Sequence, residues 1–385
     1  MQVQRTKSSA FVVFSLLICS NIAMNAFIFC PGCTPGVHYP RYLVIHPFFP
    51  GTDTDASWVG DMVTTLGRGS GITRLGIVDV IFTLDWSDAF IEQRLDMYFN
   101  ASEENDVAVL LHLDSEHFYD NRPDLWNWWN TSSPGYDPTN RDNVEWSDWD
   151  TPTTKGFLNW GTPIELAPRL CFESTVVRNE ISHKCQVIVD RLATWLTHLL
   201  SINRTDLFLG IDAGWETGID TYENVDWVPE PYRYHLGYNA LTKMGYNATN
   251  PPQDREKALA DVVHDFAAFE VQTFIDKGIS KEKLFTHIWG VEGISSPYHQ
   301  HAPLEAAFNN ASVPGFSLYP GYNRSIAPLV AGITWALMES PPVRDYQQFL
   351  TMGSIDIMVL YGWSANIRND PDAIDGIKAL LSSRL

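Results

Sequence analysis

Two glutamates, Glu216 and Glu339, each stand at the end of an apolar run and are each followed by a polar or turn-forming stretch. A pair of carboxyl groups that meets in one pocket can break a glycosidic bond. One group gives a proton to the leaving oxygen, while the other attacks the sugar or activates a water on the opposite side. We therefore expect Glu216 to be the general acid/base and Glu339 to be the nucleophile of a hydrolase.

A third glutamate competes for the role of nucleophile. Glu292 also ends an apolar run and is the alternative nucleophile to Glu339. For each of these glutamates the structural alternative is a helix cap or an ion pair. Gly214 and Trp215 precede Glu216. A glycine allows close approach of a ligand, and a neighbouring indole can help to remove water from an acid.

Residues so far apart in the chain meet only if the fold gathers the ends of its strands. Eight strand-like runs occur, most of them rich in β-branched and aromatic residues. They are Tyr42–Pro47, Thr73–Trp86, Val107–His117, Leu207–Glu216, Leu284–Glu292, Gly315–Pro320, Ile333–Glu339 and Asp356–Trp363. In a closed parallel barrel the loops after the strands' carboxyl ends converge on one face. The sequence thus predicts an α/β fold, a single (β/α)8 TIM barrel.

Helical patterns lie between these runs, as a β/α alternation requires. Residues 254–277 carry apolar side chains at helical spacing and precede Gly278, a plausible C-cap. Residues 183–200 are similarly amphipathic, and the Asp-Pro pair at 370–371 predicts the start of a last helix. The link between the sixth and seventh runs, residues 321–332, is short for a full helix.

The longest insertion, Phe118–Ser182, follows the third run and is polar, turn-rich and rich in tryptophan. A loop of this length in a compact domain is usually functional. We expect it to form a wall of the cleft, held by a disulfide between Cys171 and Cys185. Its indoles, at positions including Trp126 and Trp160, would suit stacking on sugar rings.

The third run alternates polar side chains on one face, because His112, Asp114 and Glu116 are two residues apart. Three interpretations stay open for this row. It can form a buried ion network, bind sugar hydroxyls, or bind a metal through His112, Asp114 and His117. We predict that His112 and Asp114 bind substrate. His287, at the end of another run, is more typical of a structural histidine when taken singly.

Composition sets further limits on function. The chain has 385 residues, 45% of them hydrophobic, so it can bury one large core. Its formal net charge is −20, and no Lys/Arg cluster is visible. A nucleic acid or an anionic membrane would be repelled by such a chain, so neither is an expected partner. No linker or internal repeat divides it, which favours one catalytic domain over residues 27–385.

The first 26 residues predict entry into the secretory pathway. Arg5 and Lys7 precede a short apolar run and then small and polar residues, as in a signal peptide, with a retained signal anchor as the alternative. An oxidising compartment allows Cys30 to pair with Cys33. Six N-glycosylation sequons fit the same compartment. They start at Asn100, Asn130, Asn203, Asn247, Asn310 and Asn323.

The pattern resembles the large group of retaining (β/α)8 glycoside hydrolases often called clan A. In that group an acid/base glutamate ends the fourth strand and a nucleophilic glutamate ends the seventh, matching Glu216 and Glu339. The resemblance implies that Tyr319 hydrogen-bonds the nucleophile and that Trp363 forms an aromatic platform for the sugar. One position departs from the group, because its acid/base commonly follows an asparagine and Trp215 stands here.

The sequence therefore predicts a secreted, N-glycosylated glycosidase acting on an oligo- or polysaccharide by a retaining mechanism. The substrate-binding set would be His112, Asp114, Trp215, Tyr319 and Trp363. Two carboxylates need no metal or other cofactor, and we expect none. The alternatives are a metal-dependent barrel hydrolase, which chelators would inhibit, and a carbohydrate-binding barrel without catalytic activity.

Overall fold

The computed structural model describes residues 39–47, 55–160, 162–223, 225–289, 300–301, 304–319 and 326–383. Several predictions fall outside these ranges: the signal segment 1–26, Cys30, Cys33, Glu292 and Asn323. None of the helices in the described ranges is long and apolar enough to cross a membrane.

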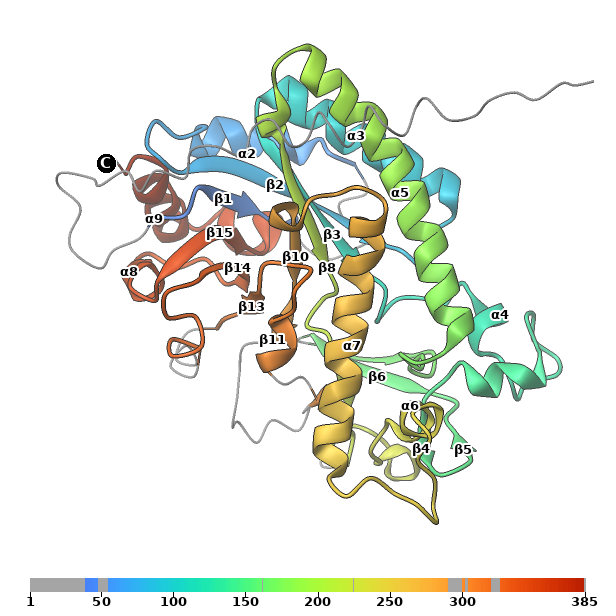
Figure 1. Ribbon diagram of the computed structural model, residues 1–385. Helices are drawn as coiled ribbons and strands as arrows, with labels where there is room; N and C mark the ends of the chain where they lie inside the picture. The colour runs from blue at the N-terminus through green and yellow to red at the C-terminus, as the bar shows by residue number, and fades with distance from the viewer. Residues whose placement is uncertain are drawn as a thin grey trace, which may run out of the picture.

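The centre of the molecule is a sheet in which all neighbouring strands run parallel (Figure 1). Its strand order is β10-β8-β3-β2-β1-β15-β14-β13-β11. The strands are β1 (Tyr42–Ile45), β2 (Arg74–Phe82), β3 (Ala108–Asp114), β8 (Phe208–Ala213), β10 (Leu284–Thr286), β11 (Ile288–Trp289), β13 (Gly315–Ser317), β14 (Thr334–Ser340) and β15 (Ser354–Leu360). Each of the eight predicted runs overlaps one of them, except the fifth, which contains both β10 and β11.

The two outermost strands in this order, β10 and β11, are parts of one run that is interrupted only at His287. β10 pairs with β8, and β11 pairs with β13. A further parallel bridge joins Phe285 of β10 to Val313, just before β13. The sheet therefore closes on itself, and the predicted single (β/α)8 barrel is confirmed.

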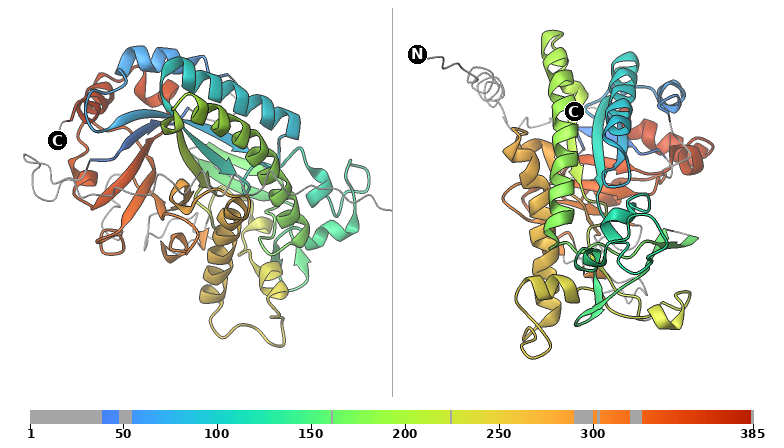
Figure 2. Two further views of the ribbon diagram at one scale, coloured as in Figure 1. Left: turned by 45° about the horizontal axis from the view of Figure 1, so that its top comes forward. Right: turned by 90° about the vertical axis from the view of Figure 1, so that its right-hand side faces the viewer.

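Helices cover the outside of the barrel (Figures 1 and 2). The long ones are α2 (Trp58–Leu66), α3 (Asp88–Asn105), α5 (Thr175–Ser201), α7 (Arg255–Asp276) and α9 (Pro371–Leu381). Ser87, Ser174, Asp254 and Asp370 begin four of them, and each side chain accepts a hydrogen bond from a backbone N–H of the first turn. The helix predicted from residue 183 begins earlier because Ser174 provides its cap.

The connections near the end of the barrel contain less helix. Between β11 and β13 the described residues include the short strand β12 (Gln300–His301) and, as their one helical element, η6 (Leu304–Ala307). Between β13 and β14 they include a turn over residues 326–332. β14 is joined to β15 through α8 (Gln347–Leu350). The expectation that the link 321–332 is too short for a full helix therefore agrees with its described part.

The segment between β3 and α5, which we call the excursion (residues 115–174), is not the structureless loop that its composition suggested. It contains α4 (Pro123–Trp126), η2 (Pro138–Asp142) and two antiparallel hairpins, β4 (Trp146–Asp148) with β5 (Thr151–Pro152) and β6 (Gly156–Trp160) with β7 (Thr162–Leu166). Trp126, Trp128 and Trp146 donate their indole N–H groups to backbone carbonyls of the excursion. These indoles therefore hold the segment together.

Alternate side chains of the strands form two apolar cores. The inner core fills the barrel and includes Val44, Val80, Leu110 and Met338. The outer core lies between the barrel and its helices and includes Ile45, Ile81 and Leu111. A ring stack between Phe99 of α3 and Trp195 of α5, with centroids 4.0 Å apart, joins two of these helices.

The predicted disulfide between Cys171 and Cys185 is wrong, because both cysteines are free thiols and both are buried. The two side chains face different surroundings. Cys171 lies near Glu145 of the excursion, whereas Cys185, on α5, lies near Glu270 of α7 and near its C-cap Lys277. Burial raises the pKa of both thiols, so neither is an activated thiolate.

The five predicted glycosylation sites in the described ranges all lie in exposed positions. They are Asn100, Asn130, Asn203, Asn247 and Asn310. Exposure is what an attached glycan requires, and the modification itself stays a prediction.

Candidate active site

Glu216 lies on the loop that follows β8, at the carboxyl end of the fourth predicted strand. The loop is tight, because Gly214 has a φ of 89° and Glu216 itself has a φ of 55°. A Cβ on Gly214 would lie 2.2 Å from Thr217 Oγ1 and 3.0 Å from Glu116 Oε1, so only glycine fits there. Thr217 donates a hydrogen bond to Glu116 Oε1 over 2.6 Å, which fixes the loop to the residue row after β3.

The backbone of Glu216 is strained relative to comparable residues. In the described part of the chain, the other non-glycine residues with positive φ are Asp106, Asp150 and Asn203, and short Asp and Asn side chains tolerate that region. Glutamate does not share this tolerance. Outliers of this kind cost about 1–3 kcal/mol and concentrate at functional sites. The strain is therefore a reason to assign Glu216 a function.

Glu339 owes its position to an irregularity in β14. Along this strand Trp335 and Leu337 point into the outer core, while Ala336 and Met338 point into the barrel. Strict alternation would aim Glu339 outward with Leu337. The pairing of β14 shifts register beside this residue on both sides, against β13 and against β15. Such bulges re-aim side chains, and this one brings Glu339 to the face that carries Glu216.

The two carboxylates meet, as the sequence analysis expected. Oxygen atoms of Glu216 and Glu339 and a ring nitrogen of His287 all lie within 4.8 Å of one another. Trp215 Nε1 donates to Glu339 Oε2 over 2.9 Å, and the Tyr319 hydroxyl donates to Glu216 Oε1 over 3.0 Å. Tyr319 therefore contacts Glu216, whereas the resemblance implied a contact with the nucleophile Glu339.

Burial and charge set the protonation of this pair. Burial, followed by repulsion from Glu216, raises the pKa of Glu339 to about 7, although His287 and the Trp215 indole oppose the shift. Burial and the two carboxylates also raise the pKa of the Tyr319 hydroxyl, which therefore stays a hydrogen-bond donor. Near neutral pH the carboxyl of Glu339 is therefore protonated in part of the molecules.

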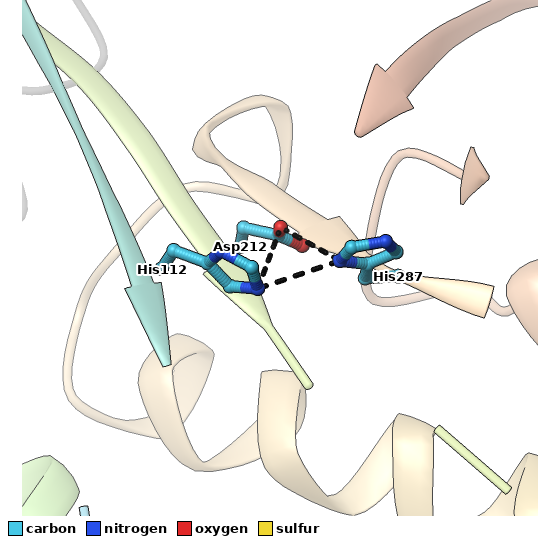
Figure 3. Close-up of side chains that lie close together, drawn as sticks. All are labelled: His112, Asp212 and His287. Carbon is cyan, nitrogen blue, oxygen red and sulfur yellow. Dashed lines mark hydrogen bonds and ion pairs between the residues drawn. The ribbon is translucent and has the colours of Figure 1, made fainter. Parts of the chain in front are cut away.

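Two histidines and an aspartate form a cluster that adjoins the pair through His287, and Figure 3 shows these three side chains. They come from neighbouring strands: His112 from β3, Asp212 from β8, and His287 from the break between β10 and β11. All three are at most 2% exposed. Burial works against a charge on His287, but Asp212 outweighs it and raises the pKa of this imidazole. Burial and the neighbouring histidines lower the pKa of His112 well below its ordinary value.

Asp114 stabilises the loop that follows β3. Its Oδ1 accepts hydrogen bonds from the backbone N–H groups of Glu116 (2.8 Å) and His117 (2.9 Å) and contacts His117 Nδ1 at 3.3 Å. His117 and His112 thus have different carboxylate partners, Asp114 and Asp212. Within the described residues, the metal set that the sequence suggested, His112 with Asp114 and His117, does not gather around one point.

Trp363 begins the turn after β15 and is 1% exposed. Its ring lies in the outer core. A platform for a sugar needs an open ring face, so Trp363 is left out of the binding set proposed below.

The sequence analysis missed three residues that the fold places at or behind the carboxylate pair. No role was predicted for Asp212, which lies in the run that ends at Glu216, or for Ser317, which lies in the sixth run. His287 was interpreted as structural, yet its Nε2 lies 2.6 Å from Ser317 Oγ, and a ring nitrogen of His287 lies within 4.8 Å of oxygens of Glu216 and Glu339. The available signal was their shared place at the carboxyl ends of adjacent predicted strands.

The chain matches no known family model and no curated protein sequence. It is similar in fold to solved structures, of which three follow. A protein described as GH26A from a Muricauda species has 10% identity and a TM-score of 0.40, over 89% of each chain. A GH5-4 broad specificity endoglucanase from an uncultured bacterium has 11% identity and a TM-score of 0.42, over 90% of this chain and 95% of the other. An exo-beta-1,4-mannosidase from Opitutaceae bacterium strain TAV5 has 12% identity and a TM-score of 0.41, over 92% of this chain and 59% of the other.

Proposed function

We propose that this protein is a glycoside hydrolase that cleaves O-glycosidic bonds of an oligo- or polysaccharide with the carboxylate pair Glu216 and Glu339. The observation that carries this proposal is the meeting of their oxygens within 4.8 Å at the carboxyl ends of the barrel strands. A strained loop and a strand bulge, two independent departures from regular structure, are both needed to bring them there. Departures of this kind are retained where they serve a function.

The spacing supports a retaining mechanism. Retaining enzymes hold their carboxyl groups about 5–5.5 Å apart, whereas inverting enzymes need about 6.5–9.5 Å to place a water under the sugar. The nearest oxygens of Glu216 and Glu339 are at most 4.8 Å apart, which is closer to the spacing of retaining enzymes than to that of inverting enzymes. One carboxylate would then attack the anomeric carbon directly, and water would hydrolyse the resulting glycosyl ester.

We assign the roles by strand position. Glu216, after the fourth strand, would protonate the leaving oxygen and later take a proton from the attacking water. Glu339, on the seventh, would form the ester, with the Trp215 N–H stabilising its anion. Tyr319, whose hydroxyl holds Glu216 in place, and Trp215 would contact the sugar bound between the carboxylates. A bound carbohydrate is the only partner this scheme requires.

The first test is the variant Glu216→Gln, assayed on natural glycans and on aryl glycosides with an activated leaving group. Loss of the proton donor should abolish most turnover of glycans. With the aryl glycoside the leaving group needs no protonation, so it should be released in a rapid burst as the glycosyl ester forms, followed by slow hydrolysis of the ester because the base is missing. Glu305→Gln, an exposed carboxylate on η6, is the matched control and should retain full activity. Near wild-type turnover of glycans by Glu216→Gln would overturn its role.

The second test separates the candidates for the nucleophile. Azide should rescue Glu339→Gly by forming a glycosyl azide, because the small anion occupies the space of the lost carboxylate. The azide product of a nucleophile variant has inverted configuration, because it forms in one displacement, whereas an acid/base variant gives an azide of retained configuration from the glycosyl ester. An inverted azide from Glu216→Gly in place of Glu339→Gly would exchange the two roles, and an inverted azide from Glu292→Gly would move the nucleophile to the alternative residue. Glycan binding without hydrolysis, unchanged in Glu216→Gln, would identify a binding barrel without catalytic activity.

We also propose that the protein is secreted and N-glycosylated, because the first 26 residues have the pattern of a signal peptide and the described sequon asparagines are exposed. Expression in a eukaryotic host should give a product in the medium whose mass falls when an endoglycosidase removes N-glycans. Retention on the membrane would support the signal anchor, and an unchanged mass would contradict glycosylation.

A further inference from the structure

Three possible metal-ligand atoms, one each from His112, Asp212 and His287, form a nearly regular triangle (Figure 3). His287 Nδ1 lies 3.3 Å from Asp212 Oδ2, and His112 Nε2 lies 3.5 Å from the same oxygen. The two ring nitrogens lie 3.4 Å from each other. The three atoms come from adjacent strands of the barrel, and His112 Nε2 also lies 3.2 Å from the carbonyl oxygen of Gly214.

These distances are too long for the charged hydrogen bonds that the same residue types form elsewhere in the protein. Hydrogen bonds between an ionised donor and a carboxylate are normally about 2.7–2.9 Å long. Three long-range histidine–carboxylate pairs in this chain reach 2.8, 2.8 and 2.9 Å. They are His183 with Asp88, His198 with Glu103, and His235 with Glu223. His112, Asp212 and His287 are buried and far apart in the chain, so no short connection holds them apart. The distances between their polar atoms are nevertheless longer than those of the three exposed pairs.

The same distances match the spacing of ligands around a tetrahedral metal ion. Zn²⁺ binds imidazole nitrogen and carboxylate oxygen at about 2.0–2.2 Å, which places neighbouring ligands of a tetrahedron about 3.3–3.6 Å apart. The observed edges of 3.3, 3.4 and 3.5 Å lie in this interval. A set of two histidines and one aspartate suits a borderline transition metal, and it is poorly suited to Mg²⁺ or Ca²⁺, which prefer oxygen.

The excess of negative charge around the cluster also favours a bound cation. Asp212 is 1% exposed, and its Oδ1 is buried without a hydrogen-bond partner. Within the described residues its ion-pair partners are the two histidines alone. Glu216 and Glu339 lie near His287 on the other side, so carboxylates outnumber cations here. A buried carboxylate with one oxygen unpartnered and the other held only by contacts of 3.3 and 3.5 Å is costly, and a bound divalent ion would lower that cost.

One neighbour fits the role of an outer partner for a metal-bound histidine. Ser317 Oγ lies 2.6 Å from His287 Nε2, the ring nitrogen that faces away from the triangle. Metal-bound histidines usually engage their second nitrogen in such a hydrogen bond, which fixes the ring orientation. If Nε2 carries the proton, the lone pair of Nδ1 points at Asp212 and is available to a metal.

We propose that His112, Asp212 and His287 bind one divalent transition metal ion, Zn²⁺ being the best match. The ion would join β3, β8 and the break between β10 and β11, and would hold His287 beneath the carboxylate pair. This site differs from the set His112, Asp114 and His117 that the sequence suggested, and it departs from the expectation of no metal. The proposal does not rest on glycosidase activity.

The test measures metal binding in the full chain, without an affinity tag that contains histidine. Cys30 and Cys33 could bind Zn²⁺ themselves, so the background protein carries Cys30→Ser and Cys33→Ser. After treatment with a chelator, calorimetric titration with Zn²⁺ should give one site per chain, and the melting temperature should rise with Zn²⁺ concentration. Co²⁺ should give the intense visible bands of tetrahedral coordination.

Variants locate the site. Asp212→Asn and His287→Gln should lose stoichiometric binding, and His264→Gln, an exposed histidine of α7, should retain it. Ser317→Ala should weaken binding about 10–100-fold, the usual effect of removing an outer partner. Because a ligand variant can fail to fold, the Co²⁺ spectrum of the background protein is a second, independent readout. Absence of a stoichiometric site there, or binding unchanged in Asp212→Asn, would overturn the proposal and leave a hydrogen-bonded network.

Discussion

The two sides of the barrel are built differently. On one side lie β2, β3 and β8, of nine, seven and six residues, which we call the long arc. On the other lie β10, β11 and β13, of three, two and three residues, which we call the short arc. The long arc is covered by α3 and α5, of 18 and 27 residues. The described links that flank β13 on the short arc contain little helix.

The site residues are divided between the two arcs. His112, Asp212 and the loop of Glu216 belong to the long arc, where His112 and Asp212 are direct partners in the longer ladder between β3 and β8. His287 and Tyr319 belong to the short arc, where the strand is interrupted or has just ended. We infer that the long arc is the more rigid part of the barrel. Side-chain contacts across the carboxyl ends of the strands hold the short arc in place. Single substitutions can test this inference.

The largest expected effect is at the buried ion pair of the long arc. Arg94 of α3 donates to Asp79 of β2 over 2.8 Å, and the two side chains are 6% and 0% exposed. Asp79→Ala would leave Arg94 buried without its partner and should lower the free energy of unfolding by about 3–5 kcal/mol. Urea denaturation measures this loss. The exposed pair Arg344 and Asp372 is the control, and Arg344→Ala should cost less than about 1 kcal/mol. Equal losses would contradict the inference that the long arc is the more rigid part.

A matched pair of leucines compares the arcs directly. Leu111 of β3 and Leu284 of β10 are both 0% exposed and both belong to the outer core. Truncation of a buried leucine to alanine costs about 2–5 kcal/mol, depending on how far the surroundings collapse into the cavity. Leu111→Ala should fall near the upper end because a long ladder resists collapse, and Leu284→Ala near the lower end. Urea midpoints that coincide would remove the distinction between the arcs.

A smaller effect, which depends on pH, is expected in the excursion that follows β3. Glu145 is 2% exposed, and burial raises the pKa of its carboxyl from 4.5 to about 7. The folded state then binds the proton more tightly than the unfolded state, so this group lowers stability as the pH rises from 4.5 to 7. At 1.36 kcal/mol per pKa unit the loss approaches about 3 kcal/mol.

Glu145→Gln isolates this contribution, because the amide cannot ionise. The free energy of unfolding of the variant should fall less than that of the wild type between pH 4.5 and pH 7, and the two curves should run parallel above pH 7. Curves that stay parallel across the whole range would show that Glu145 is not protonated in the folded protein.

The difference between the arcs also explains what the sequence could predict. Eight apolar runs were enough for the barrel, because strand-forming residues and helix caps are local signals. That Glu216 and Glu339 end strands at the same face of the barrel followed from barrel topology. The break in the fifth run at His287 and the bulge beside Glu339 could not be predicted, because both depend on pairing between strands that are distant in the chain.

The cluster of His112, Asp212 and His287 was missed for the same reason. Its members lie about 75 to 100 positions apart, so no local ligand spacing exists to be found in the sequence. The prediction of a disulfide was wrong for the opposite reason, because Cys171 and Cys185 are close in the chain but not paired in the fold. The start of α5 at Thr175 separates them, and places Cys185 on a face that packs toward α7.

The smallest effect concerns helix caps, and it should be equal on both sides of the barrel. Ser87 caps α3 over the long arc by accepting from the N–H of Phe90, and Asp254 caps α7, which packs on β10 of the short arc, by accepting from the N–H of Lys257. Alanine at either cap should cost about 1 kcal/mol, because the lost hydrogen bond is local to the first turn. Equal losses in urea denaturation would confine the difference between the arcs to their strands and links. A much larger loss for Ser87→Ala would show that α3 contributes to the rigidity of the long arc.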